Sequence, residues 1–219
     1  MRLLAFAFFA LLLGGCQSKI KQYDSTFTSK VSATGNRNST AVSAYGLRPS
    51  SLPKPRSNRK KPYFIEFRAR NALTYGHASV VFGVLDRNGR VPINKKGILT
   101  PKMVEISGLH PASTKAYLWS AGHVVPVPAE TGPSDGDFEE NYVSARYTIP
   151  LTRRQFERVV KVVYQQKKAN VIWHGVIASC VTYINFVAKD LGLKVPRRPH
   201  LPPGYVNALK NLNGKNPPI

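Results

Sequence analysis

The sequence predicts an α+β domain that follows an N-terminal tether, and three observations lead to this prediction. A stretch rich in Ser, Thr, Asn, Gly and Pro ends near residue 61. Short segments of β-branched and aromatic residues follow it, which is typical of strands. Two later stretches place apolar residues at helical spacing. After a leader segment about 204 residues remain, enough for one domain and a tail.

Residues 1–15 form the expected leader. Arg2 precedes an apolar run from Leu3 to Leu13, which is too short to cross a bilayer of roughly 30 Å as a helix. The sequence Leu13-Gly14-Gly15-Cys16 then resembles the lipobox of bacterial lipoproteins. This resemblance implies cleavage before Cys16, a lipid anchor on its thiol, and a place in the cell envelope facing the periplasm or the exterior. Gln17 resembles an outer-membrane sorting signal; the alternative is an ordinary cleaved signal peptide with an incidental cysteine.

Residues 16–61 are expected to be a flexible, disordered tether, because they lack a sustained apolar period. Residues 17–61 hold ten Lys or Arg and one acidic residue, Asp24. The domain expected over 62–219 is also basic, and the whole chain carries a formal charge of +21. For a protein in the cell envelope, the expected partners are the membrane, through the lipid anchor, and anionic lipids and envelope polymers. Nucleic acid is excluded as a partner. The alternative is that the charge serves solubility and non-specific adhesion.

The expected strands of the domain are short. They cover 63–70, 77–85, 102–106 and 143–149, with a further short strand at 171–174 that Gly175 follows, whereas 126–141 is expected to be a loop. The first helix is predicted after the capping-box pattern that starts at Thr152, with Lys167 and Lys168 in its last turn. The second is predicted over about 179–191 and ends at Gly192.

Cys180 is the candidate nucleophile. If Cys16 is lipidated, no internal disulfide can form, and an unpaired cysteine in an exported protein requires an explanation. Cys180 lies at the start of the second predicted helix, where unsatisfied backbone N–H groups favour a thiolate and can bind an oxyanion. The alternative is a small buried core residue.

His77 is the best-placed base among five histidines, because it opens a predicted buried strand. A histidine that opens an early strand, followed by a late cysteine that opens the helix Ser179-Cys180-Val181-Thr182-Tyr183-Ile184-Asn185, resembles the circularly permuted papain-like group of the NlpC/P60 superfamily. The resemblance covers roughly 77–193. It implies a papain-like fold, with an antiparallel sheet packed against helices, Cys180 as nucleophile and His77 as base. Glu105 is the candidate for the third, histidine-orienting residue, with His110 as the second candidate.

No cofactor or metal site is expected, because the sequence has no HxxxH, HExxH or CxxC spacing and no Gly-rich phosphate loop. The acidic segment around Asp135, Gly136 and Asp137 does not fit a calcium loop, so a solvated turn is expected there. Two functional classes remain. One is an envelope cysteine hydrolase or acyl transferase that acts on amide bonds of wall peptides or on lipid esters. The other is a non-catalytic basic lipoprotein that binds anionic lipid, wall polymer or a partner protein.

Overall fold

The computed structural model describes residues 55, 58–72, 75–112, 116–197, 201–215, 217 and 219. The expected signal peptide, Cys16 and nearly all of the expected tether lie outside these residues. Within the described part of the chain, no helix combines the length and the apolar character that a membrane crossing would need.

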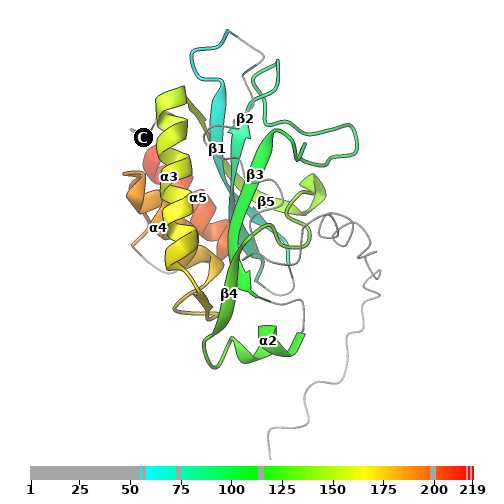
Figure 1. Cartoon of the computed structure of the whole chain (residues 1–219), viewed down its shortest axis with the longest axis vertical. Helices are drawn as coiled ribbons and strands as arrows, with labels where there is room; N and C mark the ends of the chain where they lie inside the picture. Colours follow the sequence, from blue (N-terminus) through cyan, green and yellow to red (C-terminus); the bar gives the residue numbers. More distant parts are fainter. Residues whose placement is uncertain are drawn as a thin grey trace, which may run out of the picture. The chain divides into compact units, whose positions relative to one another are not determined.

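The domain is α+β, as predicted, with helices beside a central sheet (Figure 1). The sheet has six antiparallel strands in the order β5-β1-β2-β3-β4-β6. The strands are β1 (Tyr63–Arg70), β2 (His77–Val84), β3 (Val104–Pro111), β4 (Val127–Gly132), β5 (Val143–Leu151) and β6 (Ile172–Trp173). Strands were correctly predicted at β1, β2, β5 and β6. The strand predicted over 102–106 is β3, which begins two residues later and ends five residues later than expected.

Helices α3 (Arg153–Ala169), α4 (Cys180–Asp190) and α5 (Pro202–Asn213) lie together against one face of the sheet (Figure 1). The remaining helices are α2 (Ala116–Ala121) and the short η2 (Glu140–Tyr142). The expected capping box is present at the start of α3, where the Thr152 side chain accepts from the Gln155 backbone and the Gln155 side chain accepts from the Thr152 backbone. Both predicted helices are therefore confirmed.

Both faces of the central strands are buried, each in a different way. Alternate residues of β1 and β2, such as Ile65 and Phe82, join the main core beneath the helices. On the other face Phe64 and Val81 belong to a smaller apolar cluster. Polar residues share this second face: Glu66 and Arg68 of β1 are almost fully buried as an ion pair. The alternation seen in the sequence of β1 therefore does not mark a solvent face.

Strand β4 and helix α5, like the short α2 and η2, were not predicted from the sequence. The segment 126–141 was expected to be a loop, but its first part is β4, which pairs with both β3 and β6. Sheet pairing here overrides the weak strand propensity of a segment that contains Pro and Gly. Helix α5 was not predicted; it begins at Pro202, where proline is well tolerated, and buries Tyr205, Val206 and Leu209.

Candidate functional site

Cys180 is the first residue of α4, as predicted. Ser179 caps this helix: its hydroxyl accepts a hydrogen bond from the Thr182 backbone N–H at 3.4 Å, and the Thr182 hydroxyl donates to the Ser179 carbonyl at 2.8 Å. The Cys180 side chain is buried, and the thiol is free. The cap fixes the direction of the first turn and therefore the position of the thiol.

Burial is the main influence on the Cys180 thiol and raises its pKa to about 11. Backbone N–H groups of Ala78, Val181 and Cys180 itself hydrogen-bond the sulfur and oppose this rise, whereas the negative charge of Asp137 adds to it. The resting group at neutral pH is therefore the thiol. The hydrogen bonds also show what surrounds the sulfur: the helix N-terminus on one side and the start of β2 on the other.

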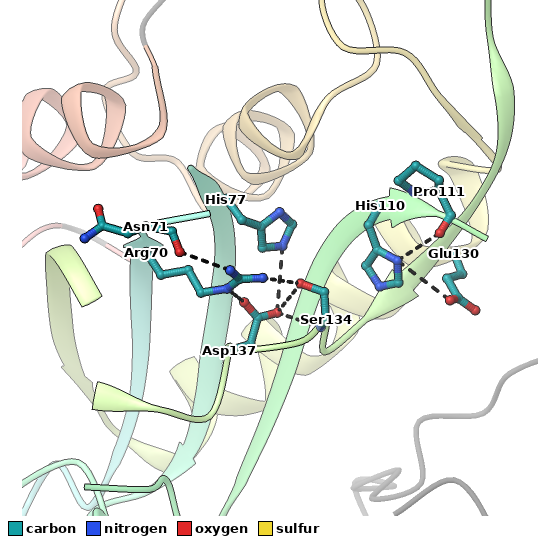
Figure 2. A network of polar contacts seen from close by, with 8 residues as sticks. All are labelled: Arg70, Asn71, His77, His110, Pro111, Glu130, Ser134 and Asp137. Atoms are coloured by element: carbon teal, nitrogen blue, oxygen red, sulfur yellow. Dashed lines mark hydrogen bonds and ion pairs between the residues drawn. The ribbon is translucent and has the colours of Figure 1, made fainter. Parts of the chain in front are cut away.

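His77 is the first residue of β2 and is buried. Its Nε2 atom lies 3.7 Å from Oδ2 of Asp137, and its other ring nitrogen points away from that carboxylate (Figure 2). Burial lowers the pKa of His77 to about 4, because the attraction of Asp137 is smaller than the cost of burying a charged imidazole beside Arg70 and His110. His77 is therefore a neutral imidazole at physiological pH, as a general base must be.

Gly108 on β3 makes room for the imidazole. A Cβ atom at this position would lie 2.6 Å from Nε2 of His77, which is closer than atoms can approach. Any other residue would therefore displace the His77 ring. The sequence alone gave no reason to single out Gly108.

Asp137 is held by a dense set of partners (Figure 2). Its Oδ1 accepts from Nε of Arg70 at 2.5 Å, and its Oδ2 accepts from the backbone N–H and the hydroxyl of Ser134 at 2.7 and 3.0 Å. Arg70 also donates to the Ser134 hydroxyl at 2.9 Å. Burial raises the pKa of Asp137, but His77, Arg70 and the Ser134 N–H outweigh this effect and hold the pKa below its ordinary value. Asp137 is therefore a buried carboxylate, and the expectation of a solvated acidic turn is wrong at this residue.

Glu105, the expected orienting residue, lies elsewhere on the sheet. It stands opposite Phe82 in the β2–β3 ladder, five residues along β2 from His77, and its carboxylate accepts from Lys167 at 3.1 Å and from the Tyr164 hydroxyl at 3.2 Å. Both partners belong to α3. The carboxylate beside His77 is Asp137, which the sequence analysis missed because nothing in its local sequence distinguishes it from a surface turn residue.

His110, the second candidate for the third residue, does lie near His77. The two rings meet edge to face with their centroids 6.4 Å apart. Nδ1 of His110 donates to the Pro111 carbonyl at 3.1 Å and lies 3.7 Å from Glu130, and its ring stacks on Trp119. His110 therefore packs beside His77 but has polar partners of its own.

The structure brings Cys180 to the beginning of β2, where His77 stands. The residue whose N–H bonds the sulfur, Ala78, directly follows His77 in the chain. Successive strand side chains point to opposite faces, so Ala78 faces α4 and the His77 ring faces Asp137. A direct contact between the thiol and the imidazole stays a prediction.

A pocket of about 600 Å³ opens beside Cys180. Its walls come mainly from the 173–182 segment, from the start of α5, and from Pro196, Arg197 and Leu201. His123 lines it and is fixed by the Trp119 carbonyl at Nδ1 (2.7 Å) and by the Tyr75 hydroxyl at Nε2 (2.5 Å). The carbonyl can only accept, so Nδ1 carries the proton and Nε2 accepts from Tyr75.

Among the described residues, no group of three or more His, Cys, Asp or Glu is arranged to hold a metal ion. No protein-family model matches the chain, and neither a curated protein nor a solved structure matches it. The resemblance to permuted papain-like proteins therefore rests on the sequence motifs and stays a prediction.

Proposed function

We propose that the chain is an envelope-anchored lipoprotein whose folded domain is a cysteine hydrolase or acyl transferase. The observation that carries this proposal is the position of the Cys180 thiol at the N-terminus of α4, against the start of β2, where His77 is a neutral imidazole with a buried carboxylate beside it. A pocket beside the thiol gives a substrate access.

In the proposed reaction, His77 takes the proton from Cys180 and the sulfur attacks a carbonyl carbon. The backbone N–H groups of Cys180 and Val181 bind the developing oxyanion. His77 then donates its proton to the leaving amine or alcohol, and the acyl group stays on the sulfur as a thioester. Water or an amine, deprotonated by His77, releases the acyl group and restores the thiol.

Asp137 is the proposed positioning residue for the base. A carboxylate opposite Nε2 favours the tautomer with a proton on Nε2, which leaves Nδ1 free to accept the thiol proton. The separation of 3.7 Å is longer than a hydrogen bond, but such contacts often tighten when substrate binds. Arg70 keeps Asp137 ionised throughout.

An activity screen tests the hydrolase proposal. The purified chain is assayed against wall-peptide amides and acyl esters of several chain lengths, beside Cys180→Ala and His77→Gln. We expect one substrate class to be turned over by the unaltered chain and by neither variant, with the acyl group trapped as a thioester on Cys180. Equal turnover by Cys180→Ala and the unaltered chain would contradict the proposal.

The anchor is tested separately. The Cys16→Ser variant should accumulate as an unprocessed or freely soluble product, because an acyl anchor survives a high-salt wash whereas attraction of a basic tether to anionic lipid does not. Processing of the variant, with retention on membranes after that wash, would contradict lipidation at Cys16.

One observation favours the second functional class, a non-catalytic basic lipoprotein that binds anionic lipid, envelope polymer or a partner protein. Burial raises the Cys180 pKa, whereas activated cysteines carry lowered pKa values. This class predicts that Cys180→Ala binds anionic vesicles or wall polymer as the unaltered chain does, and that no thioester can be trapped.

A further inference from the structure

The walls of the pocket beside Cys180 are mainly apolar. They include Trp173, Val176, Val181, Pro196, Leu201 and Pro202. Its volume of about 600 Å³ lies within the range of roughly 300–1,000 Å³ that is typical of sites for small organic ligands. The pocket is thus suited to an apolar group that ends at the thiol.

Large apolar side chains are also exposed at and near the pocket mouth. Val176 and Leu201, both lining residues, are 75% and 64% exposed. Ile177, next to Val176, is 68% exposed, and Val124 on a neighbouring loop is 80% exposed. The two loops are joined by a hydrogen bond of 2.9 Å from the Gly175 N–H to the Gly122 carbonyl. We call Val124, Ile177, Val176 and Leu201 the apolar rim; such a cluster is typical of a surface that meets another apolar phase.

The charge of the lining residues restricts the ligand further. Among the described residues that line the pocket, none is acidic and Arg197 alone carries a full charge. A wall peptide has several charged groups and many amides that would each need a polar partner when buried. An aliphatic chain has no such requirement, and Arg197 can face a phosphate or carboxylate at its polar end.

We propose that this pocket binds a single aliphatic acyl chain, with the carbonyl carbon of its ester or amide placed at Cys180. The proposal rests on the proposed hydrolase or acyl transferase function and names lipid acyl groups, not wall peptides, as its substrate class. The apolar rim provides the path by which the chain passes from a lipid surface into the pocket.

Calorimetry with saturated fatty acids of six to twelve carbons tests the proposal. The protein is the full chain with Cys16→Ser, so that an acyl group on residue 16 cannot compete, and with Cys180→Ala, so that no turnover occurs. We expect the affinity to rise about fourfold for each added methylene group that the pocket buries. An affinity that does not change with chain length would overturn the proposal.

Variants at the rim locate the site. In the same background, the double substitution Val176→Glu and Leu201→Glu should weaken binding of the twelve-carbon acid at least tenfold, because carboxylates repel the ligand and interrupt the apolar wall. Leu212→Glu is the matched control: Leu212 is 45% exposed on α5, outside the pocket, and binding should not change. Equal losses in both variants would overturn the location.

The two proposals fail in different ways. If binding depends on chain length but the protein with an intact Cys180 turns over no acyl ester, the hydrolase proposal is contradicted and the acyl-pocket proposal is supported. If the protein turns over wall-peptide amides and its affinity for fatty acids does not depend on chain length, the hydrolase proposal is supported and the acyl-pocket proposal is overturned.

Discussion

Burial keeps Cys180 and His77, the two groups of the proposed dyad, neutral at rest. The thiol of Cys180 holds its proton to high pH, and the imidazole of His77 stays unprotonated down to low pH. The site therefore differs from one with a preformed thiolate and imidazolium. In the proposed reaction, proton transfer from Cys180 to His77 therefore accompanies the arrival of a substrate that expels water and supplies the carbonyl.

We expect Cys180 to react slowly with iodoacetamide at pH 7. A pKa of about 11, against 9.0 for the reference thiol, lowers the thiolate fraction about a hundredfold, and the rate should rise about tenfold per pH unit up to pH 11. The same protein unfolded in urea is the control and should react at the ordinary rate. Fast alkylation of the folded chain at pH 6 would contradict a buried, protonated thiol.

Asp137→Asn should impair both the base and the fold. The pKa of His77 should fall further, because the attraction that raises it is lost, and Arg70 is left buried without its carboxylate, at a cost of about 3 kcal/mol. The imidazole pKa is measured by NMR titration, stability by urea unfolding, and turnover should fall at least tenfold.

Glu105→Gln is the matched control for Asp137→Asn. It alters the carboxylate that α3 binds and leaves Arg70 and Asp137 untouched. Turnover should fall less than in Asp137→Asn, and the His77 titration should not move. A larger effect of Glu105→Gln on the pKa of His77 would show that Glu105 orients the base after all.

At the scale of secondary structure elements, α4 is the element whose local sequence best predicts the place of a candidate site residue. Its N-cap, its first residue and its end at Gly192 could all be read from local sequence, because capping and left-handed termination depend on neighbouring residues. The same holds for α3 and β1. Local patterns therefore sufficed to place the proposed nucleophile on its helix and the proposed base on its strand.

The elements that could not be predicted from the sequence depend on contacts with residues far away in the chain. Strand β4 exists because β3 and β6 pair with it, and α5 exists because its apolar face packs on the sheet. Asp137 was missed for the same reason: its buried carboxylate is paired with Arg70, which lies 67 residues earlier in the chain. Glu105 was a reasonable candidate only while the faces and register of β2 and β3 were unknown.

Ser179→Ala should destabilise the domain by about 1 kcal/mol, because the Thr182 N–H loses its acceptor at the start of α4. Urea unfolding measures this loss. Ser179→Asp is the control, since a carboxylate also caps a helix, and it should retain most of the stability. Equal stability of Ser179→Ala and the unaltered chain would mean that the cap contributes little.

At the scale of the whole molecule, stability should fall in mild acid. The pKa of His77 is about 4 in the folded state and about 6.5 in the unfolded state, so the folded state binds fewer protons between these values. This stability is present above pH 6.5 and is lost as the pH falls to 4, to a total of about 3 kcal/mol. The lowered pKa of Asp137 adds a further loss below its ordinary value.

Urea unfolding at pH 7.5, 5.5 and 4 checks the acid prediction. His77→Gln should flatten the dependence between pH 6.5 and 4, because the substituted side chain does not titrate. A decline of the same steepness in this variant would assign the acid sensitivity to other groups.

The expected tether gives a second prediction at this scale. Trypsin should cut first within residues 17–61, at their ten Lys and Arg, and leave a resistant fragment that begins near Pro62. Mass spectrometry of the fragments locates the boundary. Strong protection of 17–61 would show that this segment folds onto the domain.

The order of the site residues along the chain has a consequence for biosynthesis. His77 and Asp137 emerge from the ribosome before Cys180, and α5, which lines the pocket and bonds Asn185 through Tyr205 at 3.1 Å, emerges later still. A nascent chain therefore exposes its thiol before the pocket around it can close. A product truncated before Pro202 would keep Cys180, His77 and Asp137 yet lack one wall of the pocket, so translation must proceed through α5 before the pocket is complete.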